Sequence, residues 1–222
     1  MSKILGIECA GASLSVAVLE DEKTLAFELV TAPSGYPEIL VPTVQKVIKQ
    51  AGLNYGDLDL IAAGRGAGSF TGVRIALATA SAIAMVTDKP ALGISNFAAS
   101  AFMIDEKTRA AADMIIAAIE TRRADFYIAA FAPDLSELAE PAALTADKVK
   151  DMLKGKVLIV GDAAQRLKDE LAALLTSAMD LTVIKDTVPT AETIAKYALY
   201  NQGANLPLTP LYVSPAHVTC NR

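Results

Sequence analysis

Hydrophobic and polar residues follow one another in the first hundred positions in a pattern typical of strands followed by alternating helices and strands. Short β-rich runs predict strands, and apolar positions three and four residues apart predict helices. The predicted elements are strands at 3–7, 14–20 and 24–30, a helix at about 40–51, a strand at 58–63, a helix at 71–86 and a strand at 91–95. The first three strands are predicted to form an antiparallel meander, and the last two to pair in parallel across a right-handed crossover.

Two prolines lie at the beginning of the first predicted helix. An interior proline costs a helix roughly 3 kcal/mol because it removes one hydrogen bond and clashes with the preceding turn. We therefore expect Pro37 and Pro42 to confine regular helix to the segment after about residue 40.

The second half of the chain repeats the element order of the first. A helical segment at 98–111 is followed by strands at 114–120 and 126–131, a helix at 146–153, a strand at 157–160, a helix at 163–177, a strand at 181–185 and a helix at 191–200. This order predicts a duplicated α/β unit. We place the boundary near 102–105, which divides the chain into an N-terminal lobe, 1–104, and a C-terminal lobe, 105–222.

A glycine-rich turn separates the predicted strand at 58–63 from the predicted helix at 71–86. Four glycines occur in the nine residues 64–72, where they allow positive φ and close approach of the backbone. Free N–H groups at a helix start can bind an anion, which makes Gly66, Gly68, Ser69 and Thr71 candidates for ligand binding. The lysine of a phosphate-binding loop is missing, so tight packing is favoured over anion binding.

The helix after this turn is apolar on all sides. Between residues 73 and 86 it carries one charge, Arg74, and two other polar side chains, Thr79 and Ser81, with alanines at 76, 78, 80, 82 and 84. A helix that is apolar all round must be buried all round. Other parts of the same chain could cover it, or it could form a protein–protein interface together with the helix at 40–51. We favour the interface, because an apolar helix face that is exposed to water is typical of a site of association.

Composition excludes several classes of protein. Hydrophobic residues make up 53% of the 222 residues, which excludes a disordered chain. Twenty basic and 25 acidic residues give a net charge of −5, which argues against autonomous nucleic-acid binding. We find no uncharged stretch of 18 to 20 residues and no signal peptide, so no membrane span is expected. With two cysteines, Cys9 and Cys220, the reducing cytoplasm is the expected compartment.

Catalytic signatures are sparse. His217 is the one histidine, and no zinc-binding pattern or nucleophile elbow occurs, so we predict no catalytic residue, no metal site and no cofactor. Glu8 and Glu120 follow corresponding strands of the two halves, where paired carboxylates could support Mg²⁺-dependent phosphoryl transfer. Acidic residues at strand ends are also ordinary surface residues, and we favour that interpretation.

The segment 62–84, AAGRGAGSFTGVRIALATASAIA, is similar to the signature of the TsaB family, also called YeaZ. Weaker similarity covers nearly the whole chain. It includes the opening hairpin at 3–20, the strand and turn at 116–127, the V-G-D-x-A-x-x-L segment at 157–167 and the P-x-Y ending at 210–213. The chain is thus identified as resembling a protein required for making threonylcarbamoyladenosine in tRNA.

The resemblance implies an α/β, actin-like ATPase (ribonuclease H-like) fold with two duplicated lobes, each a mixed sheet flanked by helices. It also implies a non-catalytic subunit that supports a TsaD-type threonylcarbamoyl transferase. A TsaE-type ATPase would join this complex, tRNA would be contacted only indirectly, and a homodimer would form when the chain is alone. Carried over by position, the partner interface would comprise Leu40, Val44, Val47, Ile48, Val73, Ala76, Leu77, Ala80, Ile83 and Ala84.

The chain departs from the family pattern at three places: residues 8–10, where Glu-Cys-Ala follows the first strand, residues 35–38 and Ser214. These departures argue against independent nucleotide or metal binding. The alternative function is that of an active actin-fold phosphotransferase dependent on Mg-ATP, which would use Glu8, the loop at 64–72 and Glu120.

Overall fold

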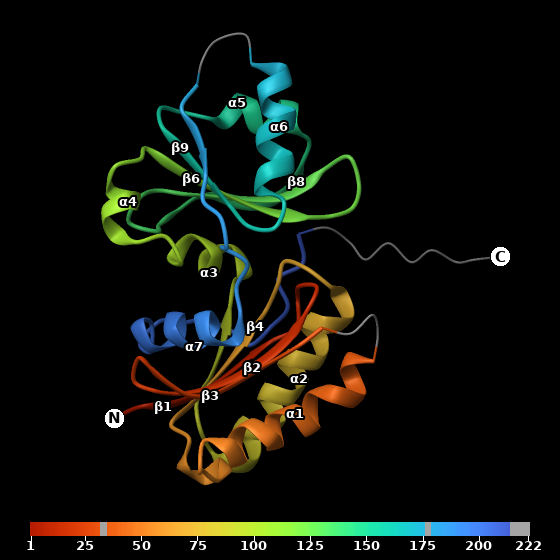
Figure 1. The fold of residues 1–222 in the computed structure, drawn as a ribbon, viewed down its shortest axis with the longest axis vertical. Coiled ribbons are helices and arrows are strands. Elements are labelled where there is room, and N and C mark those ends of the chain that lie inside the picture. Colours follow the sequence, from red (N-terminus) through yellow and green to blue (C-terminus); the bar gives the residue numbers. More distant parts are fainter. Residues whose placement is uncertain (32–34, 176–178, 214–222) are drawn as a thin grey trace, which may run out of the picture.

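The computed structural model describes residues 1–31, 35–175 and 179–213, which form two mixed five-stranded sheets, one above the other along the long axis (Figure 1). The first sheet has the strand order β3-β2-β1-β4-β5. Its strands are β1 (Lys3–Glu8), β2 (Leu14–Glu20), β3 (Lys23–Val30), β4 (Leu60–Gly64) and β5 (Ala91–Ile94). As predicted, the first three strands pair antiparallel, and β4 pairs in parallel with both β1 and β5.

The second sheet repeats this arrangement in the order β10-β9-β6-β7-β8. Its strands are β6 (Met114–Glu120), β7 (Phe126–Phe131), β8 (Glu137–Leu144), β9 (Val157–Val160) and β10 (Leu181–Val183). In reverse, this order is β8-β7-β6-β9-β10, so both sheets place the third, second, first, fourth and fifth strands of their half side by side. The predicted duplication is therefore confirmed.

The sequence analysis missed β8, the edge strand of the second sheet. Its sequence, ELAEPAAL, runs from exposed to half-buried residues without regular alternation. A strand is predicted from the alternation of a buried with a solvated face, and this strand buries neither face fully. Its pairing with β7 also contains register shifts, which accommodate Pro141 at a sheet edge.

The helices lie on both faces of each sheet (Figure 1). The helical elements are α1 (Tyr36–Gln50), the 3-10 helix η1 (Tyr55–Asp57), α2 (Phe70–Thr87), α3 (Asn96–Phe102), α4 (Glu106–Ala110), α5 (Ala146–Met152), α6 (Ala164–Leu174) and α7 (Ala191–Tyr200). Helices α1 and α2 cover one face of the first sheet, and α5 and α6 cover the outer face of the second.

Two predicted helix boundaries were wrong. Helix α1 begins at Tyr36, with Pro37 in the first turn, where its missing N–H has no helical partner to lose. Pro42 lies inside α1, and the helix continues because burial of residues such as Leu40 and Val44 offsets the lost hydrogen bond. The predicted helix at 98–111 is divided into α3 and α4, since the Asp105 carboxylate accepts a hydrogen bond from the Thr108 N–H (2.9 Å) and begins a new helix.

The last helix of each half packs against the sheet of the other half. Helix α3 packs against β6 and β7 of the second sheet, whereas α7 packs against β1, β2 and β4 of the first. Both helices therefore lie between the two sheets (Figure 1). The strands of the first sheet all precede those of the second in the chain, whereas α7, which follows them all, packs on the first sheet.

Helix α2 is 18 residues long and, by length and composition alone, could cross a membrane, which the sequence analysis did not find. Its inner face, however, packs in the core of the first lobe through Gly72, Val73, Ala76, Leu77 and Ala80. Such packing is typical of the core helix of a globular domain.

Candidate partner-binding surface

The outer face of α2 is apolar and exposed. Two of its side chains, Met85 and Val86, are 81% and 86% exposed. Ala82 and Ala78 are exposed about one and two turns before Val86 on the same helix. An exposed apolar strip of this length is unusual on a monomeric protein and marks a site of association.

Most of the residues of α1 and α2 that were predicted to form the partner interface do not lie on this exposed surface. Eight of the ten predicted interface residues are buried in the core of the first lobe: Leu40, Val44, Val47, Ile48, Val73, Ala76, Leu77 and Ala80. The other two, Ile83 and Ala84, are half-buried. The buried side chains face the sheet, because each helix first covers the apolar face of its own lobe.

A signal for the exposed face of α2 was present in the sequence. Arg74 is the one charged residue of α2, so its side chain indicates the side that faces solvent. Residues spaced by four form one ridge that winds slowly around a helix, and the next residues on the ridge of Arg74 are Ala78, Ala82 and Val86, all of them exposed.

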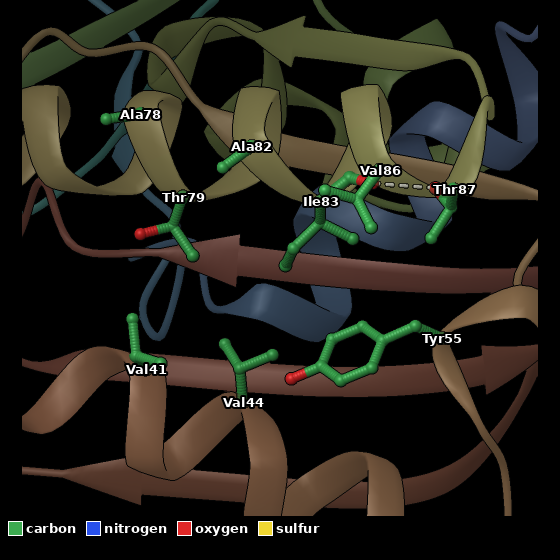
Figure 2. A pocket seen from close by; sticks show the side chains of 9 residues that line it. All are labelled: Val41, Val44, Tyr55, Ala78, Thr79, Ala82, Ile83, Val86 and Thr87. Atoms are coloured by element: carbon green, nitrogen blue, oxygen red, sulfur yellow. Dashed lines mark hydrogen bonds between the residues drawn. The ribbon is translucent and has the colours of Figure 1, made fainter.

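A groove of about 500 Å³ lies between α1 and α2 (Figure 2). It is lined by Val41, Val44, Tyr55, Ala78, Thr79, Ala82, Ile83, Val86 and Thr87. The Tyr55 side chain extends from η1 into the space between the two helices, with its ring close to Val44 in the view of Figure 2. Desolvation by burial raises the pKa of Tyr55, so its hydroxyl stays protonated at physiological pH.

Few polar atoms of the groove are available to form hydrogen bonds with water. The Thr87 hydroxyl already donates to the Ile83 carbonyl (2.7 Å) within α2, as the dashed line in Figure 2 shows. Val41 of α1 is 49% exposed at the opposite wall. A surface of this shape and chemistry fits the apolar ridge of another helix.

The predicted ligand-binding residues of the glycine turn are engaged in packing. Ser69 is the N-cap of α2, and its hydroxyl accepts a hydrogen bond from the Gly72 N–H (3.2 Å). A Cβ atom at Gly68 or Gly72 would overlap the carbonyl oxygens of Ala10 or Cys9, so the turn closes tightly on the β1–β2 hairpin.

The remaining candidates in the turn are Gly66 and Thr71. The Gly66 N–H donates to the side-chain oxygen of Asn96 (3.0 Å), and the Asn96 N–H donates to the Gly66 carbonyl (2.8 Å). Thr71 is exposed on the first turn of α2. Tight packing, which the sequence analysis favoured over anion binding, accounts for the glycines at 66, 68 and 72.

Glu8 and Glu120, the two carboxylates that a Mg-ATP-dependent phosphotransferase would use, lie in different environments. Glu8 is 2% exposed, and one of its oxygens accepts a hydrogen bond from the Ala10 N–H while the other abuts Gly64. Burial raises the pKa of Glu8 to about 7. Glu120 forms an ion pair with Arg166 (3.0 Å) and accepts a hydrogen bond from the Arg122 N–H (2.6 Å).

These environments do not favour Mg²⁺ binding by the two carboxylates. Glu8 is closed to solvent, and the charge of Glu120 is already compensated. Within residues 1–31, 35–175 and 179–213, no three His, Cys, Asp or Glu side chains are grouped as metal ligands. His217, Ser214 and Cys220 lie outside the described residues.

Comparisons with known proteins agree with this architecture. Residues 31–206 match the family model described as TsaD, tRNA N6-adenosine threonylcarbamoyltransferase. The tRNA threonylcarbamoyladenosine biosynthesis protein TsaB of Escherichia coli K12 is 34% identical over 133 residues, which are 60% of this chain and 56% of that protein. The Haemophilus influenzae TsaB is 34% identical over 56% of this chain and 51% of its own length. The chain thus spans about half the length of these curated relatives.

Solved structures confirm the fold. YeaZ from Pseudomonas aeruginosa superimposes with a TM-score of 0.74 at 22% identity, covering 96% of this chain and 100% of that chain. A ROK family protein from Streptococcus pneumoniae superimposes with a TM-score of 0.52 at 10% identity, covering 91% and 100%. The predicted actin-like ATPase fold, with two duplicated lobes of mixed sheet and helices, is therefore confirmed.

Proposed function

Because the chain belongs to the TsaD family and is a homologue of the TsaB proteins, we propose that it is a non-catalytic interaction subunit in the synthesis of threonylcarbamoyladenosine in tRNA. The chemistry would then be performed by a TsaD-type paralogue. The chain would bind that paralogue and hold it in an active assembly.

The exposed apolar surface of α1 and α2 is the observation that carries this proposal. Met85 and Val86 are almost fully exposed beside a groove of about 500 Å³. Each Å² of apolar surface removed from water contributes about 25 cal/mol, so covering this surface with another polypeptide is favourable. We therefore place the partner interface on the outer faces of α1 and α2, centred on Val41, Ala78 and Ala82.

Further partners follow from the same proposal. A TsaE-type ATPase would join the complex, and tRNA would be contacted by the paralogue rather than by this acidic chain. A second copy of the chain would use the same surface when the paralogue is absent. The reducing cytoplasm is the proposed compartment.

The substitution Ala82→Glu tests the surface. Ala82 is exposed on the outer face of α2, so the fold should tolerate the change, whereas a glutamate there would be desolvated when a partner helix packs on it. We expect co-purification with the TsaD-type paralogue to be lost, and binding measured by calorimetry to weaken at least about 100-fold.

Ala172→Glu is the matched control, because Ala172 is exposed on α6 of the second lobe. This variant should bind the paralogue as the wild type does. Undiminished binding of the Ala82→Glu variant would show that the surface has been misplaced. ATPase or transferase turnover by the purified chain alone would contradict the non-catalytic role.

A further inference from the structure

A cluster of two aromatic rings and one guanidinium lies at the beginning of α2. The guanidinium carbon of Arg74 lies 3.8 Å from the centre of the Phe70 ring. The Nε of Arg74 donates a hydrogen bond to the Tyr212 hydroxyl (2.7 Å), and the Phe70 and Tyr212 rings stack with centroids 5.4 Å apart. Phe70 and Tyr212 therefore hold the guanidinium in one orientation, although Arg74 is exposed.

Tyr212 reaches this cluster because the C-terminal segment is anchored to the first lobe. The Leu211 N–H donates to the Arg65 carbonyl (2.8 Å), and the Gly93 N–H donates to the Leu206 carbonyl (3.1 Å). The segment thus runs beside β5 and the glycine turn before Tyr212 meets Arg74. Residues 138 positions apart in the sequence therefore cooperate to orient one cation.

The oriented cation lacks an anionic partner within the described part of the chain. Among residues 1–31, 35–175 and 179–213, ion pairs form at Lys46, Arg123 and Arg166, and none involves Arg74. A guanidinium carries five N–H donors, and the bond to Tyr212 uses the one on Nε. The terminal nitrogens thus have donors to offer to a ligand.

Arg74 is continuous with the apolar outer face of α2. Phe70, Arg74, Ala78, Ala82 and Val86 follow one another at intervals of four residues, and all five are exposed. Residues four apart lie one above another on a helix. A partner that covers Ala78 and Ala82 therefore reaches Arg74 at one end of the same ridge.

We propose that Arg74, held by Phe70 and Tyr212, is a receptor for an acidic side chain of the TsaD-type partner and fixes the register of the two helices. This inference rests on the proposed function and adds the chemistry that the partner must present. A planar guanidinium matches a carboxylate through two parallel hydrogen bonds, and preorganisation by the two rings lowers the entropy lost on binding. In apolar surroundings that exclude water, such a pair specifies where the partner docks.

A protein carboxylate fits this site better than an RNA phosphate. Binding along a phosphate backbone requires several cations in a row, because each neutralised phosphate contributes only part of the affinity. Arg74 is the one charge of α2, and its neighbours on the ridge are apolar. A single acidic residue within an otherwise apolar helix of a protein partner is the complementary surface.

The test is the affinity of the complete chain for the TsaD-type paralogue, measured by calorimetry at low and high salt. Arg74→Met keeps much of the side-chain volume but removes the guanidinium. A charged hydrogen bond contributes about 10- to 100-fold in affinity, so we expect a loss of that size and a weaker dependence on salt. Arg74→Lys should recover only part of the affinity, because an ammonium cannot form the two parallel bonds.

Lys107→Met is the matched control. Lys107 is exposed on α4 and has no part in the α2 ridge, so its removal changes the net charge equally and should leave affinity unchanged. Tyr212→Phe keeps the stacked ring but removes the hydrogen bond to Arg74, and we expect it to weaken binding a few-fold. In the Arg74→Met background, Tyr212→Phe should have no further effect, since its role is to position the guanidinium.

Replacing the partner's acidic residues one at a time identifies the proposed carboxylate. One of these replacements should weaken binding to the wild-type chain but not to Arg74→Met, which is the signature of a direct pair. Equal affinities of Arg74→Met and Lys107→Met would overturn the inference. If Ala82→Glu abolished binding while Arg74→Met did not weaken it, the proposed function would stand and the inference about Arg74 would fall.

An effect of Arg74→Met on tRNA binding by the preformed complex, without an effect on complex formation, would also overturn the inference, because it would assign the cation to RNA. An effect confined to self-association would overturn it in favour of a second copy as the ligand.

Discussion

Glu8 shows at the scale of a single residue how burial changes chemistry. Its carboxyl group lies under the glycine turn, 2% exposed, with one oxygen bonded to the Ala10 N–H. Desolvation raises its pKa from 4.5 to about 7, because the charged form loses its contact with water. The group is therefore largely protonated in the folded protein at slightly acidic pH, whereas it is ionised in the unfolded chain.

This difference predicts a dependence of stability on pH. The folded state binds the Glu8 proton more tightly than the unfolded state, so its contribution is fully present below pH 4.5 and is lost as the pH rises to about 7. Between these values the free energy of unfolding should fall by up to about 3 kcal/mol relative to a Glu8→Gln variant. Urea unfolding of both proteins at pH 5 and pH 7.5 measures this difference. Parallel pH profiles for the two proteins would contradict it.

At the scale of the element, α2 combines a core face and a contact face in one apolar helix. Arg74 and the residues four, eight and twelve positions later lie outside, whereas Val73, Ala76, Leu77 and Ala80 lie inside. Composition could not separate the two faces, because alanines occur on both. The helical position of Arg74 could have done so.

The two faces predict opposite effects of the same substitution. Glutamate at Leu77 would place a charge in the core of the first lobe, where Leu77 is 5% exposed, and should cost several kcal/mol of stability. Glutamate at Ala82 should change stability by less than about 0.5 kcal/mol, because Ala82 is exposed. Thermal unfolding followed by circular dichroism compares the variants. Similar midpoints for Leu77→Glu and the wild type would show that α2 is not packed as described.

Elements with a strong hydrophobic pattern, whether periodic or a continuous apolar run, were predicted well, and weakly patterned ones were not. The β9 strand was predicted at its observed bounds, 157–160, since it is buried on both faces. Edge strand β8 was missed because its residues are largely exposed. Helix α1 was predicted too short, because the penalty of Pro42 was weighed without the burial of Leu40 and Val44 that offsets it.

At the scale of the whole molecule, the two halves depend on each other through α3 and α7. Helix α7 covers one face of the first sheet, where Ile194 and Ala195 pack against Ile4 and Leu60 in one cluster of buried residues. Helix α3 does the same for the second sheet. The halves therefore form one cooperative structure, although each has its own sheet.

Because α7 covers a face of the first sheet, we predict that the N-terminal half does not fold alone. A fragment of residues 1–113 retains all strands of the first sheet but lacks α7, so the apolar face around Ile4 and Leu60 would be exposed to water. We expect calorimetry to show no cooperative unfolding transition for this fragment, in contrast to the complete chain. A sharp transition from the isolated fragment would mean that the first sheet is stable without its covering helix.

The sequence by itself determined the order of the strongly patterned elements, the duplication and the existence of an apolar helix after a glycine turn. These features depend on local propensity and periodicity, which a chain carries wherever it folds. Tertiary structure alone decided which sheet α7 covers and that Tyr212 orients Arg74. These features depend on contacts between residues far apart in the chain, and no local pattern specifies which distant surfaces will meet.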